Sequence, residues 1–429
     1  MDNRAPFQIL GSQTPEQLFG GLKTPCYILD EAALIRNGEI MQGVARRTGA
    51  RMLLAQKAFS NYDCYPILAP FLAGTEASGL FEARLGREEL PEKENHVFCG
   101  AYRDDEFDEL LRYADHIVFN SPAQLARFGG KAKQAGKSLG LRVNPERSTQ
   151  EGHAIYDPCA PGSRLGTNRA QWDRYMTDEL IGLLDGLHFH TLCEQNSDDL
   201  ETTLDAFAEK FGDVLPRMRW LNMGGGHHVT RPDYDIPRLE RCIRRAQQAW
   251  GVTVYLEPGE AWALNAGFLA SRVLDLTENS GVKNAILDAS AACHMPDVIE
   301  MPYSPPIFEA QERSEPVGDG SPVPVTDGSP VPAADGAPVP LREPGFDCLY
   351  RLGGPTCLAG DVIGDYAFRK PLQVGDLVLF GDLAIYSTCK NNTFNGMPLP
   401  DIWLRHRDGR LERLTEFGYA DFKGRLGRR

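Results

Sequence analysis

Short apolar runs alternate with amphipathic, helix-like segments along the chain from Thr24 to about Ala270. The helix-like patterns include Glu31–Arg47 and Asp198–Phe211. Repeated β-then-α units indicate an α/β fold with a parallel sheet. About eight such units in roughly 240 residues fit a (β/α)8 barrel, and a doubly wound open sheet is the alternative. The expected strands are Cys26–Leu29, Arg51–Ala55, Val97–Cys99, His116–Phe119, Leu139–Val143, Gly186–His190, Trp220–Met223 and Val252–Leu256.

Beyond Ala270 the pattern changes to strand-like runs that are separated by Gly and Pro turns, with few helices between them. The runs Ser271–Leu276, Asn284–Asp288, Gln373–Phe380 and Ile402–His406 predict a second, mostly β domain. We therefore expect a barrel over residues 24–270 and a β domain that is built from residues 1–23 and 271–429.

Three hexapeptides of the form Asp-Gly-Ser/Ala-Pro-Val-Pro recur every eight residues, at 319–324, 327–332 and 335–340. So much Pro and Gly is incompatible with a helix or a hydrogen-bonded ladder. We expect residues from about 312 to 344 to form a disordered insertion between two strands of the β domain. A tolerated loop expansion is the simpler interpretation, and a peptide-docking role is the alternative.

Composition and charge narrow the range of functions. The chain has 42% hydrophobic and 24% charged residues, as globular proteins do. Its formal net charge of -14 disfavours nucleic acid as a partner and favours a cationic ligand. No apolar run reaches the ~20 residues of a membrane span, and Met1–Gly11 lacks the pattern of a secretory signal. Ten scattered cysteines predict reduced thiols in a cytoplasmic protein.

Lys57 follows the apolar run Arg51–Ala55, at the carboxyl end of an expected strand, where the active sites of such barrels lie. Apolar neighbours would lower the pKa of its amine and prepare it for Schiff-base chemistry. A surface lysine is the simpler alternative. On another expected strand, His188 and His190 share one face. They suit either a metal ion or a planar cofactor, unless one of them is merely a core residue.

Two further strand ends carry polar or flexible residues. Gly224, Gly225 and Gly226 would let the backbone approach a phosphate closely, although a tight turn explains them as well. Glu257 and Glu260 both follow the next strand. One carboxylate could keep a pyridine nitrogen protonated, and the other could face a substrate ammonium group.

In the β domain, Cys357 lies in a Gly- and Pro-rich loop that runs from Gly353 to Asp361. A cysteine in such a loop suits a proton donor or a nucleophile rather than a core residue. Tyr386 and the segment Phe394–Gly396 add aromatic surface near a turn.

The order of these residues resembles that of the fold-type III pyridoxal-phosphate decarboxylases, the alanine-racemase-like barrel group. Within this group the chain is most similar to the carboxynorspermidine/carboxyspermidine decarboxylase branch. The likeness runs from Thr24 almost to the C-terminus and is broken by the repeat insertion. The strings that carry it are Leu54–Ser60, Asn120–Ser121, Gly140–Pro145, Ser163–Gly166, Phe189–Glu194, Gly224–Gly226, Glu257–Ala261, Cys357–Asp361, Phe394–Gly396 and Tyr419–Lys423.

The resemblance implies pyridoxal 5′-phosphate as the cofactor, bound by a (β/α)8 barrel with a C-terminal mostly-β domain. It implies that Lys57 holds the cofactor as a Schiff base and that His190 stacks on the pyridoxal ring as part of the catalytic machinery. Gly224–Gly226 would cradle the phosphate and Tyr386 would reach it. Glu257 would pair with the pyridine nitrogen.

The resemblance also implies a homodimer with shared active sites, in which the partner subunit's Cys357 protonates the substrate carbon after CO2 leaves. Ornithine-type relatives carry arginine at the position of Glu260, where it helps hold phosphate. A carboxylate at this position favours a cationic substrate instead. Asp297 matches a second acidic position of the branch. Together with Cys357 and Asp361, these carboxylates are expected to bind a carboxylated polyamine.

Three rival functions stay open. A metal-dependent hydrolase would use His188, His190, His227 and Asp288 as ligands, whereas the preferred interpretation expects no metal. A non-enzymatic pyridoxal-phosphate carrier is the second rival. A sister decarboxylase that acts on diaminopimelate, ornithine or arginine is the third. Carboxynorspermidine and carboxyspermidine differ by one methylene, and the sequence does not separate them.

Overall fold

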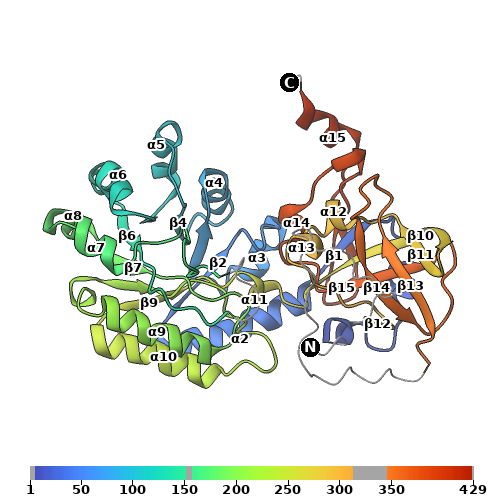
Figure 1. The fold of residues 1–429 in the computed structure, drawn as a ribbon, viewed down its shortest axis with the longest axis horizontal. Helices are drawn as coiled ribbons and strands as arrows, with labels where there is room; N and C mark the ends of the chain where they lie inside the picture. Colours follow the sequence, from blue (N-terminus) through green and yellow to red (C-terminus); the bar gives the residue numbers. More distant parts are fainter. Residues whose placement is uncertain (1–4, 151–156, 313–344, 428–429) are drawn as a thin grey trace. The chain divides into compact units, whose positions relative to one another are not determined.

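The computed structural model describes residues 5–150, 157–312 and 345–427. The three hexapeptide repeats lie outside the described residues, so the expectation of a disordered insertion stays a prediction. The chain forms two compact units, one of residues 34–264 and one of residues 1–33 with 265–429 (Figure 1).

The unit of residues 34–264 contains a closed barrel of eight parallel strands that follow one another in chain order. The α/β barrel that the sequence predicts is therefore confirmed, and the open sheet is excluded. The strands are β2 (Arg51–Ala55), β3 (Gly74–Ala77), β4 (Glu94–Phe98), β5 (His116–Phe119), β6 (Ser138–Arg142), β7 (Gly186–His188), β8 (Trp220–Asn222) and β9 (Thr253–Leu256).

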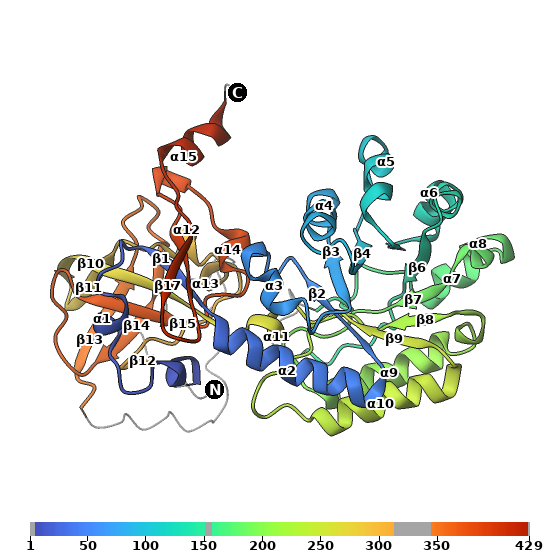
Figure 2. The ribbon, with the colours of Figure 1, turned by 180° about the vertical axis from the view of Figure 1, so that it is seen from behind.

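Amphipathic helices surround these strands (Figures 1 and 2). Helix α10 buries Leu239, Cys242, Ile243 and Ala246, at the spacing of a single helix face. The helices of this unit are α2 (Glu31–Thr48), which begins in the other unit, α3 (Tyr65–Leu68), α4 (Leu80–Glu89), α5 (Asp104–Tyr113), α6 (Pro122–Gln134), α7 (Arg169–Tyr175), α8 (Asp178–Leu183), α9 (Ser197–Phe211), α10 (Ile236–Trp250) and α11 (Glu260–Ala263).

Large side chains fill the middle of the barrel. Leu53, Val118, Trp220 and Tyr255 form one buried cluster. The Trp220 ring has space because Gly186 stands opposite it, where an added Cβ would lie 2.0 Å from the Trp220 Cδ2 atom. The interior of the barrel is thus a packed core. Polar functional residues are therefore expected at the ends of the strands.

The second unit is built on a nine-stranded sheet of order β12-β14-β13-β11-β10-β1-β16-β17, with β15 paired to β10. Its strands are β1 (Cys26–Asp30), β10 (Gly267–Asn279), β11 (Val282–Leu287), β12 (Ala310–Glu312), β13 (Cys348–Gly353), β14 (Val362–Phe368), β15 (Leu377–Gly381), β16 (Asp401–Arg405) and β17 (Leu411–Thr415). Its short helices are α1 (Pro15–Phe19), α12 (Ala291–His294), α13 (Asp297–Glu300), α14 (Ser387–Lys390) and α15 (Tyr419–Leu426). The expected mostly-β domain is confirmed.

One expected barrel strand lies in the other sheet. The run Cys26–Leu29 does form a strand, β1, but β1 pairs antiparallel with β10 and parallel with β16. The barrel is completed instead by β3, which was not predicted (Figure 2). The apolar run of four residues, Cys26–Leu29, indicates that a strand forms. It does not indicate which strands pair with it, because those strands are distant in sequence.

No helix in the described part of the chain is long and apolar enough to cross a membrane. All ten cysteines lie in the described residues, and none of them forms a disulfide bond.

Candidate active site

Lys57 lies two residues beyond the end of β2, at the carboxyl ends of the barrel strands. Its side chain is exposed, whereas Ala58 beside it is buried. The segment after β9 runs close by, because the Ala55 N–H donates to the Pro258 carbonyl at 3.3 Å. A Cβ on Gly259 would lie 2.6 Å from the Ala58 Cβ, so this approach depends on a glycine. The backbone therefore brings the Lys57 turn beside the turn that carries the two predicted glutamates.

Glu257 is 5% exposed and has a partner on each carboxylate oxygen. His188 Nε2 lies 3.0 Å from Oε2, and Asn222 Nδ2 donates to Oε1 at 2.5 Å. Burial alone would raise the pKa of Glu257, but the contact with His188 outweighs burial and lowers it to about 2. The site therefore contains a buried carboxylate that stays anionic at neutral pH.

The glycine triplet forms a tight loop after β8. Gly224 and Gly226 have φ angles of +70° and +80°, in the left-handed region that favours glycine. A Cβ on Gly225 would lie 2.5 Å from the Glu257 carbonyl oxygen and 3.3 Å from the His190 Cε1 atom. Any larger residue would displace either the backbone or the His190 ring.

His188 and His190 have different partners, although they lie in the same site. His188 faces Glu257, as described above, whereas His190 Nδ1 accepts the Gly225 N–H at 3.0 Å. Burial and the nearby Lys57 charge lower the pKa of His190 well below its usual value. A neutral His190 ring can accept this hydrogen bond and present a flat face beside the glycine loop.

Two charged residues of this site were missed in the sequence. Glu76, in the unpredicted strand β3, is 4% exposed, and burial together with the Glu257 charge raises its pKa to about 8. Arg142, at the end of β6, is 5% exposed and donates to the His190 carbonyl at 3.3 Å. Its guanidinium lies 4.6 Å from the centroid of the Phe98 ring. At neutral pH, their surroundings therefore keep Glu76 protonated and Glu257 anionic.

Glu260 begins α11 and is paired with a histidine of the glycine loop. His228 Nε2 lies 2.6 Å from Glu260 Oε2, and the two side chains are 6% and 13% exposed. Burial would lower the pKa of His228, but the hydrogen bond and charge of Glu260 outweigh it and raise the pKa above its usual value. The Glu260 carboxylate thus has the His228 ring as a cationic partner on its Oε2 atom.

In the sheet unit, the predicted loop residues have contrasting surroundings. Cys357 is exposed. Asp361 is 4% exposed and accepts hydrogen bonds from Ser290 Oγ at 2.8 Å, Thr356 Oγ1 at 2.6 Å and the Ala292 N–H at 3.2 Å. Asp361 therefore anchors the loop that presents the Cys357 thiol.

Asp297 and Tyr386 both lie beside Lys390. The Lys390 amine donates to Asp297, and to Glu300 at 2.8 Å. The same amine lies 5.7 Å from the centroid of the Tyr386 ring. Tyr386 has a φ angle of +55°, which is uncommon for a residue with a side chain and is often found at functional sites.

The residues expected as ligands in the rival metal hydrolase have other partners in the structure. His188 is held by Glu257, and His227 Nε2 lies 3.3 Å from the Met223 carbonyl. Asp288 belongs to the sheet unit and accepts hydrogen bonds from Ser271 and Thr24 there. In the part of the chain that the structure describes, the potential metal ligands that approach one another are Glu94, His96 and His116.

Comparison with known proteins identifies the family. The family model described as "Pyridoxal-dependent decarboxylase, C-terminal sheet domain" matches residues 26–384. The chain belongs to this family. It is a decarboxylase whose cofactor is pyridoxal 5′-phosphate, as the sequence predicted.

Relatives of this decarboxylase act on carboxylated polyamines. It is 39% identical to a carboxynorspermidine/carboxyspermidine decarboxylase of Campylobacter jejuni, over 94% of this chain and 98% of the relative. It is 39% identical to a carboxyaminopropylagmatine decarboxylase of Synechocystis, over 95% and 96%. The crystal structure of C. jejuni carboxynorspermidine decarboxylase complexed with norspermidine superposes with a TM-score of 0.81 and 38% identity, covering 94% of this chain and all of that one.

Proposed function

We propose that this enzyme removes CO2 from carboxynorspermidine, carboxyspermidine or both, and releases norspermidine or spermidine. The observation that carries the proposal is the similarity, over 94% of this chain, to the C. jejuni decarboxylase that was solved with norspermidine, at 38% identity and a TM-score of 0.81. The formal charge of -14 is in keeping with a cationic substrate.

The residues at the carboxyl end of the barrel fit the cofactor. Lys57 has an exposed amine that can hold the aldehyde carbon of pyridoxal phosphate covalently. The loop Gly224–Gly226 would cradle the phosphate. A Cβ on any of these glycines would meet the backbone of a neighbouring segment, so glycine is needed for the close packing of this loop. His190 would stack on the ring, and Tyr386 would reach the phosphate. When bound, pyridoxal phosphate supplies an electron sink for the pair that is released as CO2 leaves.

Glu257 would pair with the pyridine nitrogen of the cofactor and keep it protonated. Its pKa of about 2 ensures a full negative charge at neutral pH. His188 and Asn222 hold the two oxygens in place, so the carboxylate is positioned before any ligand arrives. Both neighbours therefore act through Glu257 rather than on the substrate.

Cys357 would donate the proton that replaces the departing carboxylate on the substrate carbon. The thiol is exposed on its own chain, as expected for a group that serves a second subunit. We therefore propose a homodimer in which each active site receives Cys357 of the partner subunit. As part of this proposal we place the enzyme in the reducing cytoplasm, in keeping with ten cysteines that form no disulfide bond.

Carboxylates would recognise the amines of the substrate. Glu260 keeps one oxygen on His228 and would offer the other to an ammonium group. Asp297 would act in the same way by exchanging its contact with Lys390 for a substrate amine. Asp361 would contribute by holding the Cys357 loop, and its charge would add to the attraction for a cation.

Carboxyaminopropylagmatine is a second candidate substrate, because the Synechocystis relative that acts on it is also 39% identical over almost the whole chain. This molecule ends in a guanidinium group instead of an ammonium group. A planar guanidinium favours a bidentate carboxylate partner, whereas an ammonium group is bound as a point charge. Comparing the two kinds of substrate in one assay therefore separates the candidates.

The role of Lys57 is tested by Lys57→Ala, which should abolish both CO2 release and the visible absorbance of protein-bound cofactor. Lys131→Ala, which changes an exposed lysine of α6, is the matched control and should leave both readouts unchanged. Cofactor absorbance that survived in Lys57→Ala would refute the assignment.

A further inference from the structure

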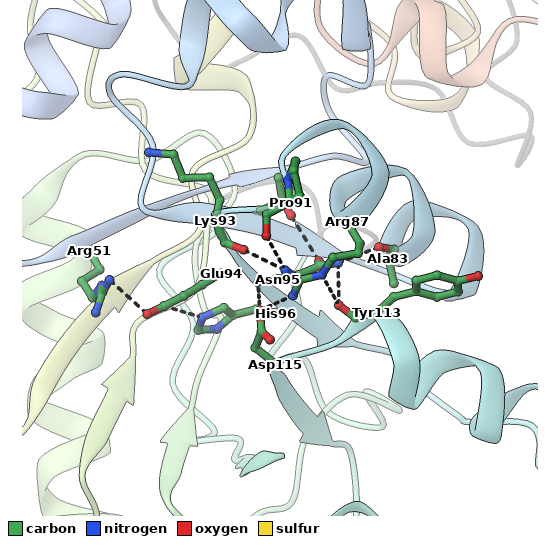
Figure 3. Close-up of polar contacts among 11 residues, drawn as sticks. Arg51, Ala83, Arg87, Pro91, Lys93, Glu94, Asn95, His96, Tyr113 and Asp115 are labelled. Atoms are coloured by element: carbon green, nitrogen blue, oxygen red, sulfur yellow. Dashed lines mark hydrogen bonds and ion pairs between the residues drawn. The ribbon is translucent and has the colours of Figure 1, made fainter. Parts of the chain in front are cut away.

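A Glu–His–His cluster lies at the end of the barrel opposite to Lys57. Glu94 is the first residue of β4, and His96 follows two positions later, on the same face of the strand. His116 is the first residue of β5 and is the register partner of His96 in the parallel pair. Glu94 and His96 point toward one another, and Arg51, the first residue of β2, forms an ion pair with Glu94 (Figure 3).

The donor atoms of the three side chains are already close together. His96 Nε2 lies 3.2 Å from Glu94 Oε2. One ligand atom from each of Glu94, His96 and His116 lies within 4.8 Å of the other two. Two ligands of one tetrahedral Zn²⁺ ion are about 3.3 Å apart at Zn–N distances of about 2.0 Å. The Glu94–His96 pair thus has this spacing, and His116 needs only a small movement to reach it.

Two ring nitrogens of the cluster have no hydrogen-bond partner. The Nδ1 atoms of His96 and His116 are both buried without a partner. The His96 side chain is only 1% exposed, so water does not readily compensate. Buried polar atoms are nearly always paired. An ion on Nδ1 of His116 would give that atom the partner it lacks, whereas His96 would bind the ion through Nε2, the atom that faces Glu94.

We propose that Glu94, His96 and His116 form a site for a transition-metal ion of the Zn²⁺ class. Two imidazoles and one carboxylate are the donor set of such ions, whereas Mg²⁺ and Ca²⁺ require oxygen ligands. The ion would join β4 to β5 at the amino end of the strands. Residues at this end of a (β/α)8 barrel contribute to stability rather than to catalysis, so the site stabilises the fold and does not take part in decarboxylation.

Two features of the structure must change when the ion binds. The His96 and His116 rings are stacked, with centroids 3.9 Å apart and planes inclined by 13°. Parallel rings cannot both direct a lone pair at one ion, so at least one ring rotates. Arg51 forms an ion pair with the other oxygen of Glu94 at 3.0 Å. Its side chain is 45% exposed and can move into solvent, which removes its repulsion of the ion.

The test uses the pyridoxal-phosphate holoenzyme after chelator treatment and desalting, with Zn²⁺ as the probe in equilibrium dialysis. The variants are His116→Asn and the isosteric Glu94→Gln. His406→Asn is the matched control, because His406 also lies between two carboxylates, Glu31 and Glu412, but outside the cluster. Exposed thiols such as Cys357 are present in every variant, so their Zn²⁺ binding cancels in the comparison.

We expect the wild-type chain and His406→Asn to bind one more Zn²⁺ per chain than His116→Asn or Glu94→Gln. Zn²⁺ should also raise the unfolding temperature of the wild type and not that of the two cluster variants. Equal Zn²⁺ binding by all four proteins would overturn the proposal. If both cluster variants lose the cofactor absorbance and so prove misfolded, the Co²⁺ spectrum of the wild type decides. Visible bands without thiolate charge-transfer absorption support the site, and their absence overturns it.

Discussion

Replacing Glu257 with glutamine isolates the contribution of one negative charge to decarboxylation. The amide has the same shape as the carboxylate, so its oxygen can still accept from Asn222 Nδ2, now 2.5 Å from Glu257 Oε1. Its NH2 group can donate to His188 Nε2, which lies 3.0 Å from Glu257 Oε2 in the wild type. Because burial and the Arg142 charge lower the pKa of His188, this ring can supply the neutral, accepting nitrogen that the amide needs. Glu257→Gln should therefore fold normally and lose only the charge.

The expected loss of kcat in Glu257→Gln follows from the weaker hydrogen bond between residue 257 and the pyridine nitrogen of the cofactor. A hydrogen bond to a charged group contributes ~1.5–3 kcal/mol, and a neutral one ~0.5–1.5 kcal/mol. The difference of about 1–2 kcal/mol corresponds to a roughly 5- to 30-fold loss of kcat, since each 1.36 kcal/mol is tenfold. The assay is CO2 release at saturating substrate, with cofactor occupancy checked by visible absorbance.

The matched control is Glu94→Gln, because Glu94 also lies in the barrel and its pKa is also lowered to about 2, against the effect of burial, by His96 and Arg51. Glu94 stands at the opposite end of the strands, so its replacement should leave kcat unchanged. If Glu257→Gln retains the wild-type kcat with full cofactor occupancy, the proposed pairing with the pyridine nitrogen is wrong.

Three further predictions concern other residues of the site. Burial and Glu257 raise the pKa of Glu76 from 4.5 to about 8. Between these pH values the native state keeps a proton on Glu76 that the unfolded chain releases, so the free energy of unfolding of the wild type falls as pH rises. The free energy of unfolding of Glu76→Gln should therefore increase relative to the wild type by about 1.4 kcal/mol for each pH unit between these values. Denaturant unfolding of the cofactor-free protein measures this, and a pH-independent difference would contradict it. His228→Leu should raise KM several-fold with little change in kcat, whereas His228→Gln, which keeps an N–H donor for Glu260, should restore KM; equal KM values in both variants would show that the contact is irrelevant to substrate binding. Cys357→Ala should keep cofactor absorbance and lose CO2 release. Mixed dimers of Cys357→Ala and Lys57→Ala chains should regain activity that neither variant has alone, because one of the two shared active sites is then intact. If activity did not recover after verified subunit exchange, the active site would not be shared between subunits.

The barrel could be predicted because each unit carries a local signal. Apolar runs of strand length and amphipathic helices recur in order, and seven of the eight barrel strands were found this way. The exception, β3, has the sequence Gly-Thr-Glu-Ala, whose glycine and buried glutamate are typical of a loop. Missing β3 also hid Glu76, because a glutamate is normally read as a surface residue.

Long-range pairing was beyond the reach of the sequence patterns. Cys26 pairs with Ala270 and with Asp401, and nothing near Cys26 distinguishes this sheet from the barrel. The Glu94–His96–His116 cluster was missed for the same reason, since His116 reaches His96 only through the register of two strands. The residues predicted for the active site of the barrel could be grouped from the sequence, because each follows the carboxyl end of an expected strand and these strand ends meet on one rim.

Substrate identity is the central claim, and a parallel CO2-release assay tests it most directly. The purified holoenzyme is given carboxynorspermidine, carboxyspermidine, carboxyaminopropylagmatine, diaminopimelate, ornithine and arginine under the same conditions. The proposal predicts the highest kcat/KM for carboxynorspermidine or carboxyspermidine, a lower value for the guanidinium substrate, and little CO2 from the three amino acids. A higher kcat/KM for any amino acid than for both carboxytriamines would contradict it.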